Sequence, residues 1–346
     1  MNKNSLLLAA VSAAILCGAA LAAEEPAGSA DAEVADRVQA DPGPASVSDA
    51  DTAADQAADT DEDAQPPMHF ESPDAAVMAL IDAAAADGSD ALHAVLGSDL
   101  EQLVSGDPVA DANDRQRFVE LARQEADIED ETDDSALLVI GPDDWPFPIP
   151  LAKDDAGWYF DTKAGIEEIL DRRIGGNELH AIAAERAFVD AEREYAAADP
   201  DGDGVRAYAD RLLSSEGKRD GLYWPTKPGE PKSPMGPLVA EAVAEGYTAA
   251  KPGEGPRAFH GYYFKVLKAQ GPDAPGGAKS YLKDGRLTEG FGLLAWPATY
   301  DNSGVMTFQV NQRGLVYQKD LGEDTAAAVT TIDAYNPGDG WEAVVD

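Results

Sequence analysis

The chain has 346 residues, of which 65 are acidic and 26 are basic, and its formal net charge at pH 7 is −39. Nucleic acids and anionic membrane surfaces both need clustered Lys and Arg, so we expect no nucleic-acid partner and no binding to such membranes. Cys17 is the only cysteine, and a chain that loses it has neither disulfides nor thiolate chemistry.

Residues 1–22 have the pattern of a cleavable secretory signal peptide. Lys3 precedes an uncharged run from Leu6 to Leu21, and Ala20-Leu21-Ala22 provides the small-x-small pattern of a cleavage site. We expect cleavage after Ala22 and a periplasmic or secreted protein. The run is about sixteen residues, shorter than the roughly 20 that cross a bilayer, so we expect no stable membrane insertion after cleavage. A lipoprotein acylated at Cys17 is the alternative.

Residues 23–67 form an acidic leader. They contain thirteen Asp or Glu and a single basic residue, Arg37, and they lack Leu, Ile, Phe, Tyr and Trp. Such a segment buries too little apolar surface to offset its chain entropy, so we expect it to be disordered. A calcium-buffering or partner-binding tail is the alternative to a solvated spacer.

Residues 68–165 predict a small α+β unit. Ser72-Pro73-Asp74 has the N-cap, first-turn proline and acid of a helix start. Further helices are predicted at 90–96 and 114–124 from their apolar spacing. Short apolar runs separated by Gly, Pro and Asp then predict an antiparallel meander, with strands at 136–140, 147–152 and 157–160.

Residues 166–346 predict a second unit, in which a long helix precedes a four-stranded antiparallel sheet. The helical apolar period runs from Ile166 to the loop at Asp199, with an interruption at Gly175-Gly176, and a short helix is predicted over 237–246. The predicted strands are 259–267, 291–296, 305–310 and 315–318, the last two joined by a hairpin loop ending at Gly314. The whole chain is thus predicted to be α+β.

The loop after the long helix has the spacing of a calcium site. Carboxylates stand at positions 1, 3 and 5 and glycine at position 6, which lets alternating side chains converge on one cation. The predicted ligands are Asp199, Asp201, Asp203, the carbonyl of Val205 and Asp210. A helix over 207–213 would complete the motif, and the site would be structural. Ordinary Asp-Gly turn chemistry is the alternative, because position 12 is Asp where Glu is usual.

No catalytic motif is found. The four histidines, His69, His93, His180 and His260, lack metal-ligand spacing and are interpreted as surface or cap residues. The chain has neither a GxSxG elbow nor a phosphate loop. The loop aromatics Tyr223, Trp224 and Trp145 are candidates for a binding surface, with packing at the edge of the core as the alternative.

Several segments resemble one bacterial family. Asp143–Pro150, Arg172–Gly175, Lys218–Pro225, His260–Phe264 and Ser303–Phe308 occur in order as they do in the exported family catalogued as domain of unknown function 2950. The resemblance extends from about Phe70 to Trp341. It implies an exported bacterial protein and carries no activity or catalytic residue with it.

Each unit also has a weaker likeness. The long helix followed by an antiparallel sheet resembles the globular part of type IV pilins and pseudopilins, although those proteins keep an apolar N-terminal helix, whereas the corresponding helix here is charged and begins mid-chain. The paired helices that lead to Gly157-Trp158-Tyr159-Phe160 resemble the cone-shaped fold of nuclear transport factor 2. The first likeness implies a pilin-like rear unit and the second a cone-like front unit.

Two functions are compatible with these observations. The first is a non-enzymatic envelope protein that binds a protein or cell-wall partner. The alternative is a periplasmic hydrolase or ligand-processing protein with a pocket in or between the two units. A pocket that holds an acid beside a base would favour the enzyme, whereas a solid core with an exposed apolar patch would favour the binding protein.

Overall fold

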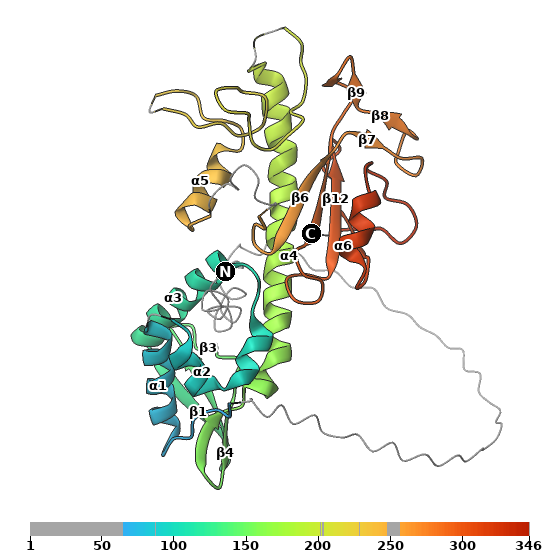
Figure 1. Cartoon of the computed structure of the whole chain (residues 1–346). Coiled ribbons are helices and arrows are strands. Elements are labelled where there is room, and N and C mark those ends of the chain that lie inside the picture. The colour runs from blue at the N-terminus through green and yellow to red at the C-terminus, as the bar shows by residue number, and fades with distance from the viewer. Residues whose placement is uncertain are drawn as a thin grey trace, which may run out of the picture.

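A 37-residue helix, α4 (Thr162–Ala198), connects two groups of helices and strands. In the computed structural model of the chain, the N-terminal group packs beside the lower half of α4 and the C-terminal sheet beside its upper half (Figure 1). The structure describes residues 65–345 apart from Asp87, Asp201, Asp203, Pro228 and residues 248–256. The predicted signal peptide, its cleavage site after Ala22 and the leader up to residue 64 lie outside the described residues.

The last residues of the predicted leader are part of the folded chain. The carbonyl of Gln65 accepts a hydrogen bond from the Ser98 amide at 2.9 Å, and the Met68 amide donates one to the Ala94 carbonyl at 3.0 Å. These bonds attach the segment to the second helix and the turn after it. Among the described residues, no helix has both the length and the apolar character that a membrane-spanning segment needs.

The front unit packs its helices against an antiparallel sheet, with strand order β1-β2-β4-β5 and β3 paired to β2. Ser72 caps the first helix by accepting the Ala75 amide at 3.2 Å, as predicted. Rings from α3, β5 and the β3–β4 connection meet in the core, with Phe147 5.3 Å from Phe118 and 6.0 Å from Phe160 between centroids. The helices are α1 (Pro73–Ala85), α2 (Asp90–Leu96), the 3₁₀ turn η3 (Ser98–Leu103) and α3 (Pro108–Gln124). The strands are β1 (Ala126–Thr132), β2 (Ser135–Ile140), β3 (Trp145–Pro146), β4 (Leu151–Asp154) and β5 (Gly157–Phe160).

Two elements of the front unit differ from the prediction. Helix α3 begins at Pro108, not at residue 114, because the Asp107 side chain caps it by accepting the amides of Val109 and Ala110, both at 3.1 Å. Strand β1 was not predicted, because its sequence is mainly acidic. It forms an edge strand whose Ala126 and Ile128 pack against the core, and edge positions tolerate charge on the solvent side.

The rear unit is a five-stranded antiparallel sheet, in the order β14-β13-β12-β11-β6, with α4 on one face. Phe188 and Val189 of α4 belong to the same core as Phe308 and Val310 of the sheet. The opposite face carries a smaller core around Leu294 and Tyr335. The main elements are α5 (Gly236–Ala244), β6 (Tyr262–Leu267), β11 (Gly292–Pro297), β12 (Met306–Asn311), β13 (Tyr317–Asp320) and β14 (Glu342–Ala343). The minor elements are β7 (Ala269–Gln270), β8 (Lys279–Ser280), β9 (Leu282–Lys283), β10 (Arg286–Leu287), α6 (Thr325–Ala328) and the 3₁₀ turn η4 (Val329–Thr331).

The α+β class is confirmed, and two details of the rear unit are corrected. The sheet has a fifth strand, β14, because the C-terminal segment returns to pair with β13. The predicted interruption at Gly175-Gly176 is wrong, since α4 is continuous through it and through the predicted boundary between residues 165 and 166. Glycine in a helix interior costs roughly 1 kcal/mol relative to alanine, and packing of α4 against both units offsets that cost.

Two glycines of α4 should respond oppositely to replacement with alanine. A Cβ on Gly165 would lie 2.9 Å from the Ile149 Cα and from the Pro148 carbonyl oxygen, whereas a Cβ on Gly175 would meet nothing within 4 Å. We expect Gly165→Ala to lower the free energy of unfolding by about 1–3 kcal/mol through overpacking, and Gly175→Ala to raise it by about 0.5–1 kcal/mol. Urea unfolding of both variants checks this, and equal effects would contradict it.

Candidate functional site

A polar cleft of about 590 Å³ opens between α3, the C-terminal end of α5 and His260. It therefore lies where the front unit meets the rear unit; Figure 1 shows α3 below α5. The Asn113 side chain bridges the cleft by donating a hydrogen bond to the Glu245 carbonyl at 2.8 Å. Its polar lining residues include Asn113, Asp114, Arg117, Glu120, Glu245 and His260.

Asp107 ties the two units together at a small cavity that shares Ala110 and Asp114 with the cleft. One carboxylate oxygen caps α3, and the other accepts hydrogen bonds from the Tyr247 hydroxyl at 2.8 Å and the Gly261 amide at 3.4 Å. The Tyr247 hydroxyl in turn accepts the His260 amide at 3.3 Å. Burial and the Asp107 carboxylate raise the pKa of Tyr247, so its hydroxyl remains a donor. The segment that contains His260 is thus positioned by an acid from the front unit.

Two more acids follow on the same face of α3, at the spacing that places side chains on adjacent turns. Asp111 and Asp114 are buried, at 4 % and 7 % exposure. The Ser105 hydroxyl donates to Asp111 at 2.6 Å. Burial raises the pKa of Asp111 to about 7, and burial together with the Asp111 charge raises that of Asp114 to about 8. At neutral pH the Asp114 carboxyl is therefore largely protonated and offers a hydrogen-bond donor.

Arg173 of α4 lies beneath these acids and contacts both units. Its guanidinium donates to the Asn302 side chain at 2.8 Å and to the Leu103 carbonyl. Asn302 also donates to the Val104 carbonyl at 3.1 Å. Burial lowers the pKa of Arg173, and the charges of Asp111 and Asp114 oppose that shift. The group is nevertheless charged at any physiological pH, so it partly compensates the buried acids.

His260, which lines the cleft, forms a pair with a second histidine. The rings of His180 and His260 are stacked, with centroids 4.1 Å apart and planes at 12°. Burial and the neighbouring His180 lower the pKa of His260 to about 3, so its ring is neutral. Nε2 of His260 lies 3.2 Å from a Glu245 carboxylate oxygen, but that oxygen lacks hydrogen-bond geometry to any partner among the described residues. This proximity is therefore not a salt bridge.

The backbone at His260 is unusual. Its φ is +45°, a left-handed conformation that only a few per cent of non-glycine residues adopt. The next residue, Gly261, has φ +69°, and a Cβ there would lie 2.5 Å from the Asn177 amide nitrogen. Strained conformations of this kind persist where the surrounding structure holds them, and they cluster at functional sites.

The polar cleft was not predicted from the sequence. The interpretation of His260 as a surface or cap residue is wrong, because its side chain is buried, at 9 % exposure, and stacks on half-buried His180, 80 positions away in the sequence. No local spacing could indicate this. The sequence did contain one sign of this site, because the acids at 107, 111 and 114 repeat at helical spacing. The repeat can be recognised only if the helix is taken to begin at Pro108, whereas the predicted helix begins at residue 114.

The predicted calcium loop is described only in part. Asp201 and Asp203 lie outside the described residues. Asp199, in a left-handed conformation at the end of α4, accepts the Gly204 amide at 3.0 Å, and Val205 is exposed. No helix forms over 207–213, where Tyr208 instead pairs with Leu287. The helix–loop–helix part of the prediction is therefore wrong, and calcium binding itself stays a prediction.

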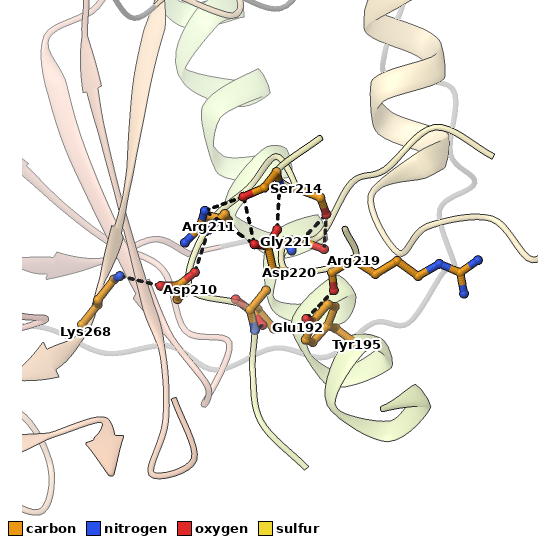
Figure 2. A network of polar contacts seen from close by, with 11 residues as sticks. Glu192, Tyr195, Asp210, Arg211, Ser214, Arg219, Asp220, Gly221 and Lys268 are labelled. Carbon is orange, nitrogen blue, oxygen red and sulfur yellow. Dashed lines mark hydrogen bonds and ion pairs between the residues drawn. The ribbon is translucent and has the colours of Figure 1, made fainter. Parts of the chain in front are cut away.

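Asp210, the predicted closing ligand, is engaged by two cations (Figure 2). Its oxygens lie 2.8 Å from Arg211 Nε and 3.0 Å from Lys268 Nζ. The hydrogen bond from Arg211 lowers its pKa, with a further contribution from Lys268. In the same network, buried Glu192 accepts the Ala209 amide at 2.8 Å. Within the part of the chain that the structure describes, no group of three or more His, Cys, Asp or Glu residues is arranged to hold a metal ion.

The three predicted surface aromatics do not form one surface. Trp145 packs against the front core, with the Arg172 guanidinium 4.5 Å from its ring centroid. Trp224 is buried in the rear core, beside the ring of Tyr195 at 6.4 Å. Tyr223 lies on the wall of a separate apolar cavity. Packing thus accounts for the positions of both tryptophans.

Comparison with known proteins identifies the family. The model of the family described as "Protein of unknown function (DUF2950)" matches residues 68–344. The chain therefore belongs to this family, and the resemblance predicted from its sequence segments is confirmed. No match is found among curated proteins or among solved structures. The likenesses to pilins and to nuclear transport factor 2 stay predictions.

Proposed function

We propose that this member of the DUF2950 family is an exported bacterial envelope protein that binds a polar ligand in the cleft between α3 and His260. One observation carries the proposal: two elements that are distant in sequence each place a buried polar side chain at the same cleft, Asp114 from α3 and His260 from the start of the rear sheet. Buried acids destabilise a fold unless they are compensated, and perturbed titratable groups in a cleft are a recognised mark of functional sites.

The lining indicates the chemistry of the ligand. Asp114, Glu120 and Glu245 provide three carboxyl groups, whereas Arg117 provides the cation. The amides of Asn113, Gln116 and Gln124 and the neutral ring of His260 complete the polar lining. This set can form hydrogen bonds with a ligand rich in hydroxyl and amide groups. In the envelope, the amino-sugar peptides of the cell wall carry many hydroxyl and amide groups, and they are the ligand class we propose.

A hydrolase acting on the same ligand is the second candidate. With a pKa of about 8, Asp114 is protonated at neutral pH and lines the cleft, as a general acid must. Neutral His260, which lines the same cleft, provides an acceptor or donor for the substrate or for water. On this reading Asp114 would protonate the leaving group, and turnover would fall as the pH rises through about 8.

Titration of the purified protein with soluble muropeptides tests the binding proposal. We expect saturable binding by calorimetry, at least tenfold weaker in Asp114→Asn and in His260→Ala, and unchanged in Glu167→Gln, an exposed carboxylate of α4 outside the cleft. Absence of muropeptide binding, or equal binding by Asp114→Asn, would refute it.

Mass spectrometry of the same mixtures separates the two candidates. A binding protein leaves the muropeptides intact. The hydrolase produces fragments, and Asp114→Asn abolishes their formation because the amide is too weak an acid to protonate the leaving group. Fragmentation that persists in Asp114→Asn would exclude Asp114 as the acid.

A further inference from the structure

A small cavity adjoins the polar cleft where the two units meet. Its volume is about 10 Å³, and Ala110 and Asp114 line both the cavity and the cleft. A cavity must offer roughly 10–15 Å³ to hold one water molecule, so this one has room for a single water and for no larger ligand. Six polar side chains line it, each at most 7 % exposed: Ser105, Asp107, Asp111, Asp114, Arg173 and Asn177.

Asp114 differs from the other two acids of this lining in its contacts. Both oxygens of Asp107 accept hydrogen bonds, and Asp111 accepts one from the Ser105 hydroxyl. The Asp114 carboxyl, in contrast, forms no hydrogen bond or ion pair with any described residue. Buried polar groups are nearly always hydrogen-bonded, either to protein or to ordered water. We therefore expect this carboxyl to have a water partner in the space that it lines.

Two side chains of α4 can complete the hydrogen bonding of a water in this cavity. The Arg173 guanidinium has five N–H donors, of which two bond to Asn302 and Leu103. The Asn177 amide donates one N–H to a carbonyl of the rear unit at 2.9 Å, which leaves its other N–H and its oxygen for a further partner. Together with Asp114 from α3, these groups provide the roughly three partners that a buried water usually has.

The charge of the lining favours water over a metal cation. Three carboxyl groups line the cavity, but buried Arg173 places a fixed positive charge beside them. Burial and the Asp111 charge raise the pKa of Asp114 to about 8, so one of the three carboxyl groups is largely uncharged at neutral pH. A cation would be repelled by the guanidinium, whereas a neutral molecule is not.

We propose that this cavity binds one ordered water molecule, which joins the Asp114 carboxyl of the front unit to Asn177 and Arg173 of α4. Water both donates and accepts, so it can accept from a carboxyl O–H or donate to a carboxylate, and Asp114 keeps its partner in either protonation state. Because Asp114 also lines the cleft, the water is connected through it with the ligand of the cleft. The water site depends on the cavity and not on that ligand, so failure of either proposal leaves the other standing.

Magnetic relaxation dispersion of water oxygen-17 tests the site, because it counts the water molecules that stay inside a protein for longer than the protein takes to tumble. Ala110→Val should lower this count by one, since its added methyl groups occupy the cavity. Ala112→Val, on the same helix but exposed and outside the lining, should leave the count unchanged. Circular dichroism of both variants confirms that they are folded. Equal counts in the unmodified protein and in Ala110→Val would overturn the proposal.

A high-resolution crystal structure of the unmodified protein locates the water independently of any variant. We expect one peak of electron density in the cavity, within about 3.2 Å of the Asp114 carboxyl and of Arg173 or Asn177. Absence of that peak would overturn the proposal. A peak whose ligands lie at the roughly 2.0–2.6 Å typical of a metal cation would also overturn it, and would assign the cavity to the cation instead.

Discussion

Arg173→Ala is expected to lower the free energy of unfolding by about 3–5 kcal/mol, the usual cost of removing one partner from a buried charged network. The side chain is 4 % exposed and contacts both units, through the Leu103 carbonyl and Asn302. Without the guanidinium, the side-chain oxygen of Asn302 and the carbonyl oxygen of Leu103 each lose a hydrogen-bond donor. Asp111 and Asp114 also lose the arginine charge that favours their ionised forms, so their pKa values should rise further.

Urea unfolding monitored by circular dichroism measures this cost, and Arg193→Ala is the matched control. Arg193 lies on the same helix, but its side chain is 54 % exposed and pairs with Asp190 at 3.1 Å. Exposed pairs of this kind contribute roughly 0–1 kcal/mol. If both variants lose the same stability, the buried network does not hold the two units together, and the site would owe its geometry to the backbone alone.

Much of the fold could be predicted because its signals are local. Ser72-Pro73 starts α1 where the capping pattern indicates, and Gly314 has the positive φ, +81°, that the hairpin loop requires. The four predicted strands of the rear sheet appear as β6, β11, β12 and β13, within a few residues of the expected bounds. Capping chemistry and alternation are properties of a few neighbouring residues, so a single sequence contains them.

The remainder depends on partners that are distant in sequence. Strand β1 is too acidic to be recognised alone and exists because β2 pairs with it. Glycines 175 and 176 look like a helix break, but contacts of α4 with both units keep it continuous. The site shows this most clearly, since His180, His260 and Asp107 come from three separate segments. Their convergence is a property of the tertiary fold, which periodicity does not encode.

The protein should also be more stable in mild acid than in mild base. Burial raises the pKa of Asp111 to about 7 and those of Asp114 and Glu192 to about 8, and it raises the pKa of Glu185 as well. Glu185 is fully buried, and neither of its carboxylate oxygens has a hydrogen-bond partner in the described part of the chain. A carboxyl with this environment must remain protonated in the folded state.

The sign of the effect follows from proton binding. Because these four pKa values are higher in the folded chain than in the unfolded chain, their stabilising contribution is complete below about pH 4. The contribution of Asp111, Asp114 and Glu192 is lost as the pH rises through about 7–8, and that of Glu185 is lost in the same direction. Each pKa unit corresponds to about 1.4 kcal/mol, so several kcal/mol are lost between pH 5 and pH 9. The lowered pKa of His260, about 3 in the folded chain, opposes this trend below about pH 6.5, because the unfolded ring then gains a proton that the folded ring does not. The lowered pKa values of Asp210 and Asp220 also act in the opposite direction, toward low pH. Both groups are substantially solvent-exposed, so we expect their effect to be small.

Urea unfolding at pH 5, 7 and 9 measures how the free energy of unfolding depends on pH. Two variants show how much of this dependence comes from the cleft and how much from the rear unit. Asp114→Asn cannot ionise, so it should lose part of the pH dependence, and Glu185→Gln should remove another part. Glu167→Gln, an exposed carboxylate, should leave the slope unchanged. Greater stability at pH 9 than at pH 5 would contradict the raised pKa values. If Glu185→Gln alone removed the slope, Asp114 would be ionised at neutral pH, and its role as a proton donor in the cleft would be excluded.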